Sequence, residues 1–477
     1  MKKSVLAAGL AAVLPACAAI WGFEDGTLGV DGELLPTDAS KNDDATEPMR
    51  DGGPSDADVI DPNELSDAAP PGCTERVVER NSYFVDTRTG DDIDACGSLN
   101  SPCRTFGALL GQIQPEAPVR LHVYVGVGDY AESVVLPAAL RGRGLQIDGR
   151  WFVRYDGQGR QWLPYCGSVA TRLLGTEAAV VRVDGNGTSA APDAGNTGDP
   201  GLPPDDLGLW NLHLEGRPAA PAESVYGLFA TDARVTLSDT TIVVARGGDG
   251  AVGAAGTAGT AQGNDCPPNA ALPDRAPGPP GDSGNDAPPQ APGSFTRAGY
   301  TAAAPPPGIP GEPGSAGGPI AQCSLVVAPA KAGCGGTGGS AGGPGVLGGA
   351  SVGLYLWSSS VSLSRVVLQT GGGGAGGPGG AGGPGGPGRD GQGGLGVLCP
   401  ALGLIGSKGG AGGAGGAGPA APGGPSYCAV AVGGAAVEGA DPSACTTGPG
   451  GAGGGTAAAG NAAALYTEPD GGTEPSP

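Results

Sequence analysis

Two similar stretches of sequence decide the fold: "GLFATDARVTLSDTTIVVARGGDG" at residues 227–250 and "GLYLWSSSVSLSRVVLQTGGGGAG" at residues 353–376. In this alignment Leu228 matches Leu354 and Val235 matches Val361. Apolar and polar residues alternate within each copy, which predicts β-strands. A single copy cannot bury its apolar face alone, so the repeat indicates stacked coils of a solenoid.

Both copies run directly into glycine, so the residues between them are predicted to leave the solenoid at one corner and to return to it. The other boundaries follow from shifts in composition. The predicted parts are a lipoprotein signal peptide with its lipobox (1–17), an acidic disordered tether (18–76), a β-helix N-terminal cap with the first coils (77–246), a Gly/Pro-rich insertion (247–351), a returning rung (352–370) and a Gly-rich C-terminal region (371–477).

Glycine dominates the composition, with 97 Gly and 47 Pro in 477 residues, so much of the chain cannot belong to a side-chain core. Glycine recurs at every third position in six blocks, at 247–261, 308–317, 335–345, 373–391, 409–418 and 448–454. This period suits a collagen triple helix or a bundle of polyglycine or polyproline II helices. Gly or Ala mostly stands where collagen has Pro, which disfavours collagen. Flexible loops are the remaining alternative, and the cysteines near the blocks favour the ordered bundle.

The N-terminus has the features of an export signal. Two lysines precede an apolar run over residues 5–14, which is too short to span a bilayer. The run ends in "LPAC", which resembles a bacterial lipobox except for Pro15, so we expect Cys17 to carry lipid. An ordinary signal peptide with a cysteine there by chance is the alternative. In lipoproteins of this class, Ala18 after the cysteine favours the outer membrane.

Acidic residues concentrate after this signal. Residues 24–72 contain 14 Asp and Glu against Lys41 and Arg50, and such a segment cannot bury enough apolar surface to fold. We expect it to act as an extended tether. The net charge of −22 argues against nucleic acid as a partner and against binding to anionic lipid head groups through charge.

Ten cysteines remain besides Cys17, and an even number in an exported chain predicts disulfides. A zinc site is disfavoured because the chain has no CxxC pair and only two His, so we expect neither a metal nor another cofactor. Cys96 and Cys103, which flank "GSLNSP", are the first pair expected. The candidates are Cys73, Cys96, Cys103, Cys166, Cys266, Cys323, Cys334, Cys399, Cys428 and Cys445.

The stretch "YFVDTRTGDDIDACGSLNSPCRTFGALL", residues 83–110, reads as a β-rich run, a polar turn and a helix from Arg104 to about Ile113. It resembles the N-terminal signature of right-handed parallel β-helix proteins of the pectin-lyase-like superfamily. The resemblance is carried by Tyr83, Val85, Gly90, Pro102, Arg104 and Thr105. It implies an all-β fold, a right-handed parallel β-helix with long Gly-rich insertions.

The lipobox, acidic tether, β-helix signature and "GGxGGxGG" insertions together resemble a group of Gly-rich surface lipoproteins of myxobacteria and their relatives. The glycine segments resemble mycobacterial PGRS-type proteins. This resemblance implies a non-enzymatic structural or adhesive scaffold of the bacterial envelope, held at the outer membrane by its lipid. Fold does not imply function, so a polysaccharide-binding or polysaccharide-cleaving β-helix is the alternative.

Candidate catalytic residues are few. Asp148, Arg150 and Asp184 could gather on one face, but each lies beside Gly, as turn residues do. His122 and His213 lie in strand-like runs and are interpreted as packed or surface residues. A calcium site at Asp91, Asp92 and Asp94 is left open, with solvated cap-loop acids as the ordinary interpretation. The prediction is therefore that the protein is not an enzyme.

One basic and aromatic stretch, residues 140–162, stands out in this acidic chain. Such side chains can stack on sugars and bind acidic polysaccharide through guanidinium groups. The alternative is that the aromatic residues cover the first coils and the arginines lie at the rim. An ice-binding role for the glycine helices ranks last, because regular Thr-x-Thr arrays are absent from the sequence. The candidate patch is Arg150, Trp151, Arg154, Tyr155 and Trp162.

Overall fold

The computed structural model divides the chain into two units, Met1–Ser66 and Asp67–Pro477, and its described residues all lie in the second. The predicted signal peptide, Cys17 and the tether fall outside the described residues, as do Cys73, Cys323 and Cys399. The described residues are 78–79, 82–113, 121–137, 140, 144–156, 159–167, 170–184, 207–263, 266–319, 326–328, 330–396 and 405–468.

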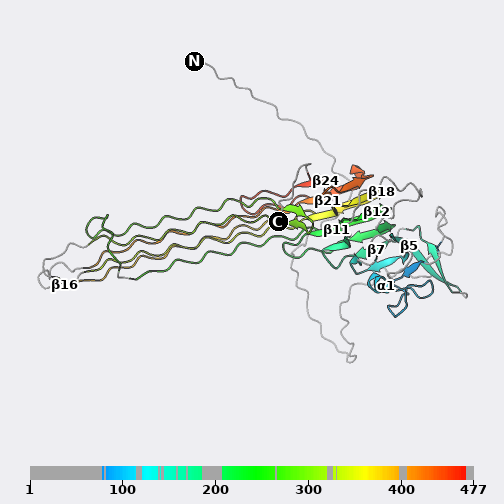
Figure 1. Ribbon diagram of the computed structural model, residues 1–477, viewed down its shortest axis with the longest axis horizontal. Coiled ribbons are helices and arrows are strands. Elements are labelled where there is room, and N and C mark those ends of the chain that lie inside the picture. Colours follow the sequence, from blue (N-terminus) through cyan, green and yellow to red (C-terminus); the bar gives the residue numbers. More distant parts are fainter. Residues whose placement is uncertain are drawn as a thin grey trace, which may run out of the picture. The chain divides into compact units, whose positions relative to one another are not determined.

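Three parallel sheets form the body of this unit (Figure 1). Sheet 1 has the order β1 (Tyr83–Val85), β2 (Leu121–Gly126), β5 (Leu145–Asp156), β9 (Leu207–Trp210), β12 (Arg234–Ser238), β18 (Ser360–Ser364) and β22 (Ala436–Glu438). Sheet 2 contains β3 (Gly128–Tyr130), β7 (Thr171–Leu174), β10 (Leu212–Glu215), β13 (Thr241–Val244), β19 (Val367–Thr370) and β23 (Cys445–Thr447). Sheet 3 contains β4 (Val134–Leu136), β8 (Ala179–Asp184), β11 (Val225–Thr231), β17 (Ser351–Trp357), β21 (Ser426–Val432) and β24 (Ala462–Thr467).

The chain visits the sheets in the order 1, 2, 3 and then returns to sheet 1 one rung further along, which makes a parallel β-helix. The all-β fold predicted from the sequence is confirmed. The two repeats stack as neighbouring coils, since Leu228 pairs with Leu354 and Val235 pairs with Val361. Among the described strands, the antiparallel addition to sheet 1 is β6 (Gly159–Pro164), which forms a hairpin with β5.

Aliphatic side chains fill the interior in columns, one from each coil. Val181, Leu228 and Leu354 are adjacent in sheet 3 and are each at most 1% exposed. The N-terminal end is covered by α1 (Phe106–Gln112), whose Phe106 and Leu109 join this core. The helix begins two residues later than predicted because the Thr105 side chain caps it by accepting a hydrogen bond from the Ala108 amide.

Three insertions leave the solenoid at one corner, between sheets 2 and 3. They follow β13, β19 and β23 in three successive coils, whereas the same corner is a short turn in the coil that contains β7 and β8. The C-terminal region, predicted only as Gly-rich, therefore also holds β21, β22, β23 and β24. These strands were not predicted from the sequence because they are short and rich in small residues; β21 reads "SYCAVAV" and β24 reads "AAALYT".

The two long insertions form a bundle of extended glycine segments that run alternately away from the solenoid and back to it (Figure 1). Residues three apart along a segment donate their amides to the same neighbouring segment; Gly377, Gly380 and Gly383, for example, donate to Val346, Gly343 and Ser340. This is the period of a polyproline II-type helix. We number the segments I (247–261), II (276–290), III (308–318), IV (333–349), V (371–391) and VI (407–424).

Glycine is required in the bundle because backbones approach closely. A Cβ on Gly383 would lie 2.0 Å from the Thr257 carbonyl oxygen, and one on Gly415 would lie 2.0 Å from that of Ser340. The ordered bundle is therefore the alternative that the structure supports, with all segments from one chain rather than three. Residues 448–454 are one arm of the short last insertion, which returns to β24, and they also pack on segments V and VI, where the Gly451 amide donates to Gly424.

Segment II was missed by the sequence interpretation. Gly278 and Gly281 keep the period of three, but Ala287 and Gln290 occupy later positions where glycine would continue it. The Gln290 side chain is buried and donates from Nε2 to the Gly345 carbonyl oxygen at 2.7 Å, so it replaces a backbone partner. A glycine count does not detect such a position.

Two small ribbons attach to the bundle. The hairpin of β14 (Ser294–Thr296) and β15 (Gly299–Thr301) packs against sheet 3, where the rings of Phe295 and Tyr466 are 5.1 Å apart. The Tyr300 amide also donates to the Tyr226 hydroxyl at 2.9 Å. The second ribbon pairs β16 (Val326–Ala328) with β20 (Leu395–Gly396) at the end of the bundle away from the solenoid (Figure 1).

Candidate functional site: a groove on sheet 1

A groove of about 390 Å³ lies on the outer face of sheet 1, across β2, β5, β9, β12 and the end of β18. Its position follows from the strand register. His122 pairs with Gln146, and Asp148 pairs with Trp210, so residues far apart in sequence form columns on one face. The lining residues are Glu79, His122, Tyr124, Gln146, Asp148, Trp151, Trp210, Asn211, Ser238, Asp239 and Arg365.

Three carboxylates line the groove, and each is held by a neighbour. Asp148 is 5% exposed and accepts a hydrogen bond from Asn211 Nδ2 at 2.7 Å. Glu79 lies 3.2 Å from His122 Nε2. Asp239 forms a two-pronged ion pair with the Arg365 guanidinium.

Two residues with buried indole N–H groups line the same groove. Trp151 is fully buried and Trp210 is partly buried, and neither Nε1 has a hydrogen-bond partner among the described residues. Tyr124 also lines the groove; burial raises the pKa of its hydroxyl, which accepts a hydrogen bond from the Glu79 amide at 3.1 Å. A buried N–H without an acceptor costs about 1–3 kcal/mol. Both Nε1 atoms are covered by protein, so an acceptor in the groove would recover that free energy only after the indole ring turns its N–H group toward it.

The structure divides the patch predicted from residues 150–162. Trp151 and Trp162 are 0% and 6% exposed and pack with Phe84 and Tyr124 in one aromatic cluster, so they offer no stacking face to solvent. Trp162 Nε1 donates to the Leu99 carbonyl oxygen at 3.3 Å. The aromatic residues therefore cover the first coils, which was the structural alternative.

The rest of that patch lies near the β5–β6 hairpin. Tyr155 is 56% exposed and Arg154 is also exposed. The Arg150 amide donates to Thr171 Oγ1 at 2.8 Å. These three side chains are separate from the eleven that line the groove; of the predicted patch, only Trp151 belongs to it.

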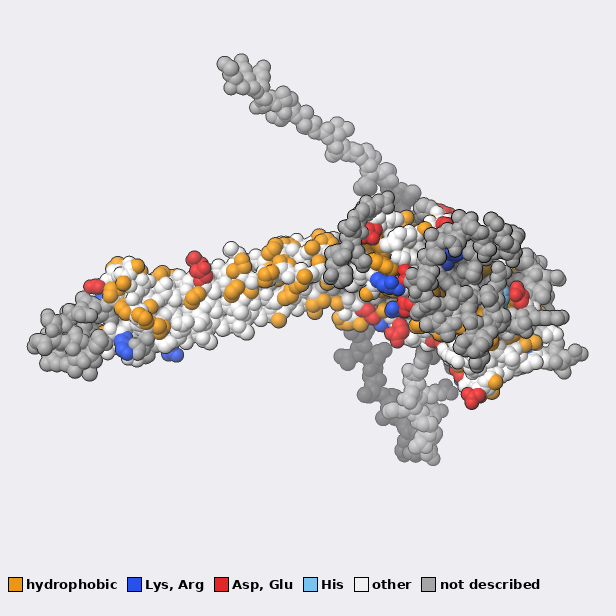
Figure 2. All heavy atoms as spheres, viewed as in Figure 1, with side chains coloured by type: hydrophobic (Ala, Val, Ile, Leu, Met, Phe, Trp, Pro, Cys, Tyr) orange, Lys and Arg blue, Asp and Glu red, His pale blue; other side chains and the backbone are white. Residues whose placement is uncertain are grey.

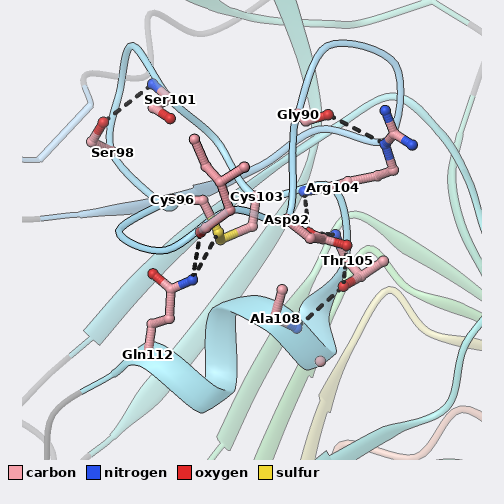
Figure 3. Close-up of a disulfide and its surroundings, with 12 residues drawn as sticks. Gly90, Asp92, Cys96, Ser98, Ser101, Cys103, Arg104, Thr105, Ala108 and Gln112 are labelled. Carbon is pink, nitrogen blue, oxygen red and sulfur yellow. Dashed lines mark hydrogen bonds between the residues drawn. A yellow bond between two sulfur atoms is a disulfide. The ribbon is translucent and has the colours of Figure 1, made fainter.

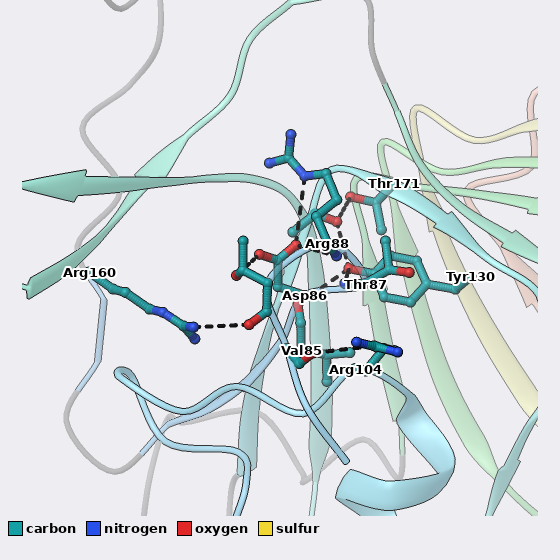
Figure 4. A network of polar contacts seen from close by, with 11 residues as sticks. Val85, Asp86, Thr87, Arg88, Arg104, Tyr130, Arg160 and Thr171 are labelled. Carbon is teal, nitrogen blue, oxygen red and sulfur yellow. Dashed lines mark hydrogen bonds and ion pairs between the residues drawn. The ribbon is translucent and has the colours of Figure 1, made fainter. Parts of the chain in front are cut away.

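A buried carboxylate organises the arch formed by residues 86–90, which follow β1 (Figure 4). Asp86 is 0% exposed and accepts hydrogen bonds from the Arg88 amide at 3.4 Å and from the Thr89 hydroxyl. Arg160 Nη2 donates to the Thr89 carbonyl oxygen at 2.9 Å and so ties the β5–β6 hairpin to this arch. Tyr130 completes the network by donating to the Gly126 carbonyl oxygen at 3.0 Å.

The three residues considered for catalysis are not brought together. Asp148 lies in the groove, whereas Asp184 lies on sheet 3, where it accepts a hydrogen bond from Thr231 Oγ1 at 3.1 Å. Arg150 is not among the groove residues. His122 pairs with Glu79 in the groove, while His213 lies on sheet 2, where burial first and Arg172 second lower its pKa.

The acidic turn before α1 has a structural role (Figure 3). Asp92 accepts hydrogen bonds from the amides of Arg104 and Thr105 at 2.8 and 3.0 Å and so joins the turn to the start of the helix. Asp91 and Asp94 are exposed. Within the described part of the chain, no group of three or more His, Cys, Asp or Glu is placed to hold a metal ion.

Disulfides connect each part of the described unit. The predicted Cys96–Cys103 bridge closes the turn beside α1 (Figure 3). Cys266–Cys334 joins the chain after segment I to segment IV, and Cys428–Cys445 joins sheet 3 to sheet 2. Cys166 is also disulfide-bonded.

Most groove residues gave no signal in the sequence. Gln146, Trp210, Asp239 and Arg365 come from four different coils or turns, and only the stacking register brings them together. A positive φ of 57° at Asn211 and 49° at Asp239 places both at tight turns next to strand ends. Asn and Asp are the residues that tolerate this conformation, so an "N" or "D" directly after an alternating strand was the available signal.

Comparison with known proteins does not assign the chain to a family. No family model and no curated protein matches the chain. Among solved structures it is similar to the GH136 lacto-N-biosidase from Eubacterium ramulus, in the selenomethionine derivative at 12% identity, over 34% of this chain and 27% of that one, with a TM-score of 0.18. The native form matches at 10% identity, over 36% and 35% of the two chains, with a TM-score of 0.13.

The chain thus spans about a third of the length of these enzymes. Likeness at this level carries no conclusion about activity, and the fold rests on the strand register described above. In the described residues, no helix is both long enough and apolar enough to cross a bilayer.

Proposed function

We propose that the protein is an exported, lipid-anchored scaffold of the bacterial envelope that binds a neutral or mixed polysaccharide in the sheet 1 groove. The observation that carries the binding proposal is the pair of buried indole N–H groups of Trp151 and Trp210, which lie beside one groove without acceptors among the described residues and would have to turn toward a ligand on binding. A sugar hydroxyl supplies the missing acceptor.

The chemistry of the groove suits a polyhydroxyl ligand. Each sugar hydroxyl can donate and accept at once, and the groove offers both kinds of partner: the carboxylates of Asp148 and Asp239 accept, and the two indoles donate. A groove that crosses several coils also follows the long axis of the solenoid. An extended polymer fits such a site better than a single small molecule does.

Export and lipid anchoring are supported by the sequence before the described unit and by the disulfides within it. The "LPAC" stretch that ends at Cys17 resembles a lipobox, and disulfides persist in oxidising compartments outside the cytosol. Mass spectrometry of the membrane-extracted protein tests this part. Acyl chains on Cys17 are expected, and an unmodified thiol at that position would contradict it.

Cleavage of the bound polysaccharide is the second candidate, and the presence of three carboxylates in one groove favours it. Hydrolysis of a glycosidic bond uses a pair of carboxyl groups on either side of the bond. The contact of Glu79 with His122, the ion pair of Asp239 and the hydrogen bond to Asp148 favour ligand holding over proton donation. Incubation with a polysaccharide panel distinguishes the two, because cleavage releases reducing ends and binding alone does not.

The binding test uses Trp210→Phe, which keeps an aromatic ring and removes the N–H. Affinity electrophoresis against the polysaccharide panel is expected to show at least a several-fold weaker retention, from loss of one hydrogen bond of about 1 kcal/mol. Trp357→Phe on sheet 3 is the matched control, since Trp357 is outside the groove. Equal retention of the wild type and both variants, or no retention of any, would overturn the proposal.

A further inference from the structure

The charges of the glycine bundle are unevenly placed. Apart from Arg365 of the solenoid, five basic residues lie within the described parts of residues 247–424, and four of them are at the end away from the solenoid: Arg275, Lys331, Arg389 and Lys408. The fifth, Arg297, lies in the β14–β15 hairpin and pairs with Asp232 of the solenoid. Figure 2 shows this on one face, where Lys and Arg appear at the far end of the bundle and at its base but not between. The four side chains at the far end are exposed.

Backbone hydrogen bonds fix these residues at one level. The Lys331 amide donates to Gln392 at 3.1 Å, and the Arg389 amide donates to Cys334 at 3.0 Å. Gly409, next to Lys408, donates to the Arg389 carbonyl oxygen at 2.9 Å. Segments IV, V and VI therefore present three cations side by side where they end.

An exposed apolar residue lies at the same end. Ile405 is 73% exposed, the highest value among the exposed large apolar side chains of the described residues, and it precedes Gly406, which bridges to Gly391. We name the surface formed by the four basic residues and Ile405 the bundle tip. Exposed apolar groups combined with basic groups are typical of surfaces that lie in a membrane interface.

The charge of the whole protein does not decide what the bundle tip binds. Segment V has a length of roughly 60 Å at the rise of a polyproline II helix, and charges act over only about 10 Å at ordinary ionic strength. Along segment II, Asp282 is seven residues from Arg275, roughly 20 Å away. Asp274 and Asp390 lie at the tip itself, so four cations against two carboxylates leave an excess of two positive charges among the described residues.

We propose that the bundle tip docks on an anionic membrane surface, with the basic residues at the head groups and Ile405 in the interface. Apolar side chains gain free energy in lipid and none in a hydrated polysaccharide, which favours a membrane as the occupant. This proposal goes beyond polysaccharide binding and uses a separate part of the molecule. It also reverses, for this surface alone, the expectation drawn from the net charge.

The experiment is vesicle co-sedimentation of the full chain carrying Cys17→Ser, which removes the N-terminal lipid as a second anchor. The protein is expected to bind vesicles made of equal parts phosphatidylcholine and phosphatidylglycerol, to bind phosphatidylcholine vesicles much less, and to be released by salt. The combined variant Lys331→Gln, Arg389→Gln and Lys408→Gln should lower the partition coefficient on the order of a hundredfold.

A matched control neutralises three arginines on the solenoid, Arg172, Arg182 and Arg234, which changes the net charge equally and leaves the tip intact. It should bind mixed vesicles as the parent does. Ile405→Ser should lower binding roughly tenfold, from loss of one buried aliphatic side chain.

Three outcomes would overturn the proposal: no partition onto mixed vesicles, equal partition onto both kinds, or equal losses in the tip variant and the solenoid control. Retention on an anionic polysaccharide without vesicle binding would likewise replace the membrane by a polymer. Circular dichroism and hydrogen exchange of segments IV and V show whether each variant keeps the bundle. Polysaccharide retention through Trp210 is measured separately, so failure of one proposal leaves the other standing.

Discussion

The solenoid and the glycine bundle solve the same problem in opposite ways. Both must satisfy backbone amides that neighbouring segments withdraw from water. In the solenoid, parallel strands pair in register and aliphatic side chains such as Leu354 fill the space between sheets. In the bundle, segments touch through their backbones, and a Cβ on Gly383 would meet a carbonyl oxygen at 2.0 Å. Packed side chains stabilise the solenoid, whereas the bundle depends on backbone contacts that only glycine permits.

This difference predicts different sources of stability. Aliphatic burial contributes roughly 25 cal/mol for each Å² removed from water, and the bundle has little of it to bury. Glycine also loses more conformational entropy on folding than any other residue. The bundle must therefore depend on its hydrogen bonds, on the disulfide that limits the unfolded chain and on its attachment to the stacked coils.

The largest expected effect breaks the bundle by removing its disulfide. Cys266→Ser with Cys334→Ser opens a loop with a sequence separation of 68, for which chain entropy predicts a loss of about 4 kcal/mol. Hydrogen exchange should accelerate in segments I and IV while sheet 1 stays protected. The solenoid counterpart, Cys428→Ser with Cys445→Ser, has a separation of 17 and should cost about 3 kcal/mol. Equal protection of the bundle with and without its bridge would contradict this dependence.

A core truncation tests the solenoid side of the comparison. Leu354→Ala removes a fully buried side chain between neighbouring coils and should cost about 3 kcal/mol. Chemical denaturation followed by far-ultraviolet circular dichroism measures it. The expected pattern is loss of the whole fold at lower denaturant, since the bundle is anchored on the affected coils. Loss of the solenoid with a bundle that keeps its exchange protection would show that the two regions fold independently.

Adding a single methyl group to a bundle glycine tests whether the backbones of the bundle pack closely. Gly383→Ala places a Cβ against the Thr257 backbone and displaces hydrogen bonds to Ser340 and Gly415, with an expected cost of about 2 kcal/mol. The matched control is Ala381→Ser, an exposed position on the same segment, which should change the free energy of unfolding by less than about 0.5 kcal/mol. Similar effects of the two substitutions would argue against close backbone packing.

High pH should loosen the contact between the regions. Burial raises the pKa of Tyr300 from 10.0 to about 12, and burial also raises the pKa of Tyr226 and Tyr355 beneath the β14–β15 hairpin. A raised folded-state pKa means that the stability is fully present below about pH 10 and is lost as the pH rises toward 12. For Tyr300 the loss is roughly 2 kcal/mol. Phenolate absorbance with near-ultraviolet circular dichroism should show late tyrosine ionisation coupled to hairpin release; ordinary ionisation near pH 10 would contradict burial.

More of the solenoid than of the bundle or the groove could be predicted from the sequence. Alternation in residues 227–244 and 353–370 encodes an inward face, and the repeat itself revealed the stacking of Leu228 on Leu354. The recurrence of glycine at every third position indicated most of the extended segments but not segment II. There Gln290 stands at a glycine position, and its side chain donates a hydrogen bond to a neighbouring segment. The groove was out of reach because Trp210 and Arg365 become neighbours only when coils stack in one register.

The smallest expected effect comes from two glycines near the N-terminal end of the solenoid, one in a helix and one in a turn with positive φ. Gly111 lies exposed in α1, and a Cβ there would have nothing within 4 Å, so Gly111→Ala should stabilise the protein by up to about 1 kcal/mol through helix propensity. Gly97 is the control: its φ is 99°, and a Cβ there would lie 2.7 Å from a Leu109 methyl carbon, so Gly97→Ala should be destabilising. Thermal unfolding of the two variants should shift in opposite directions. A shift of both in the same direction would mean that glycine in this chain is selected for composition and not, position by position, for the space and the backbone conformation that each site requires.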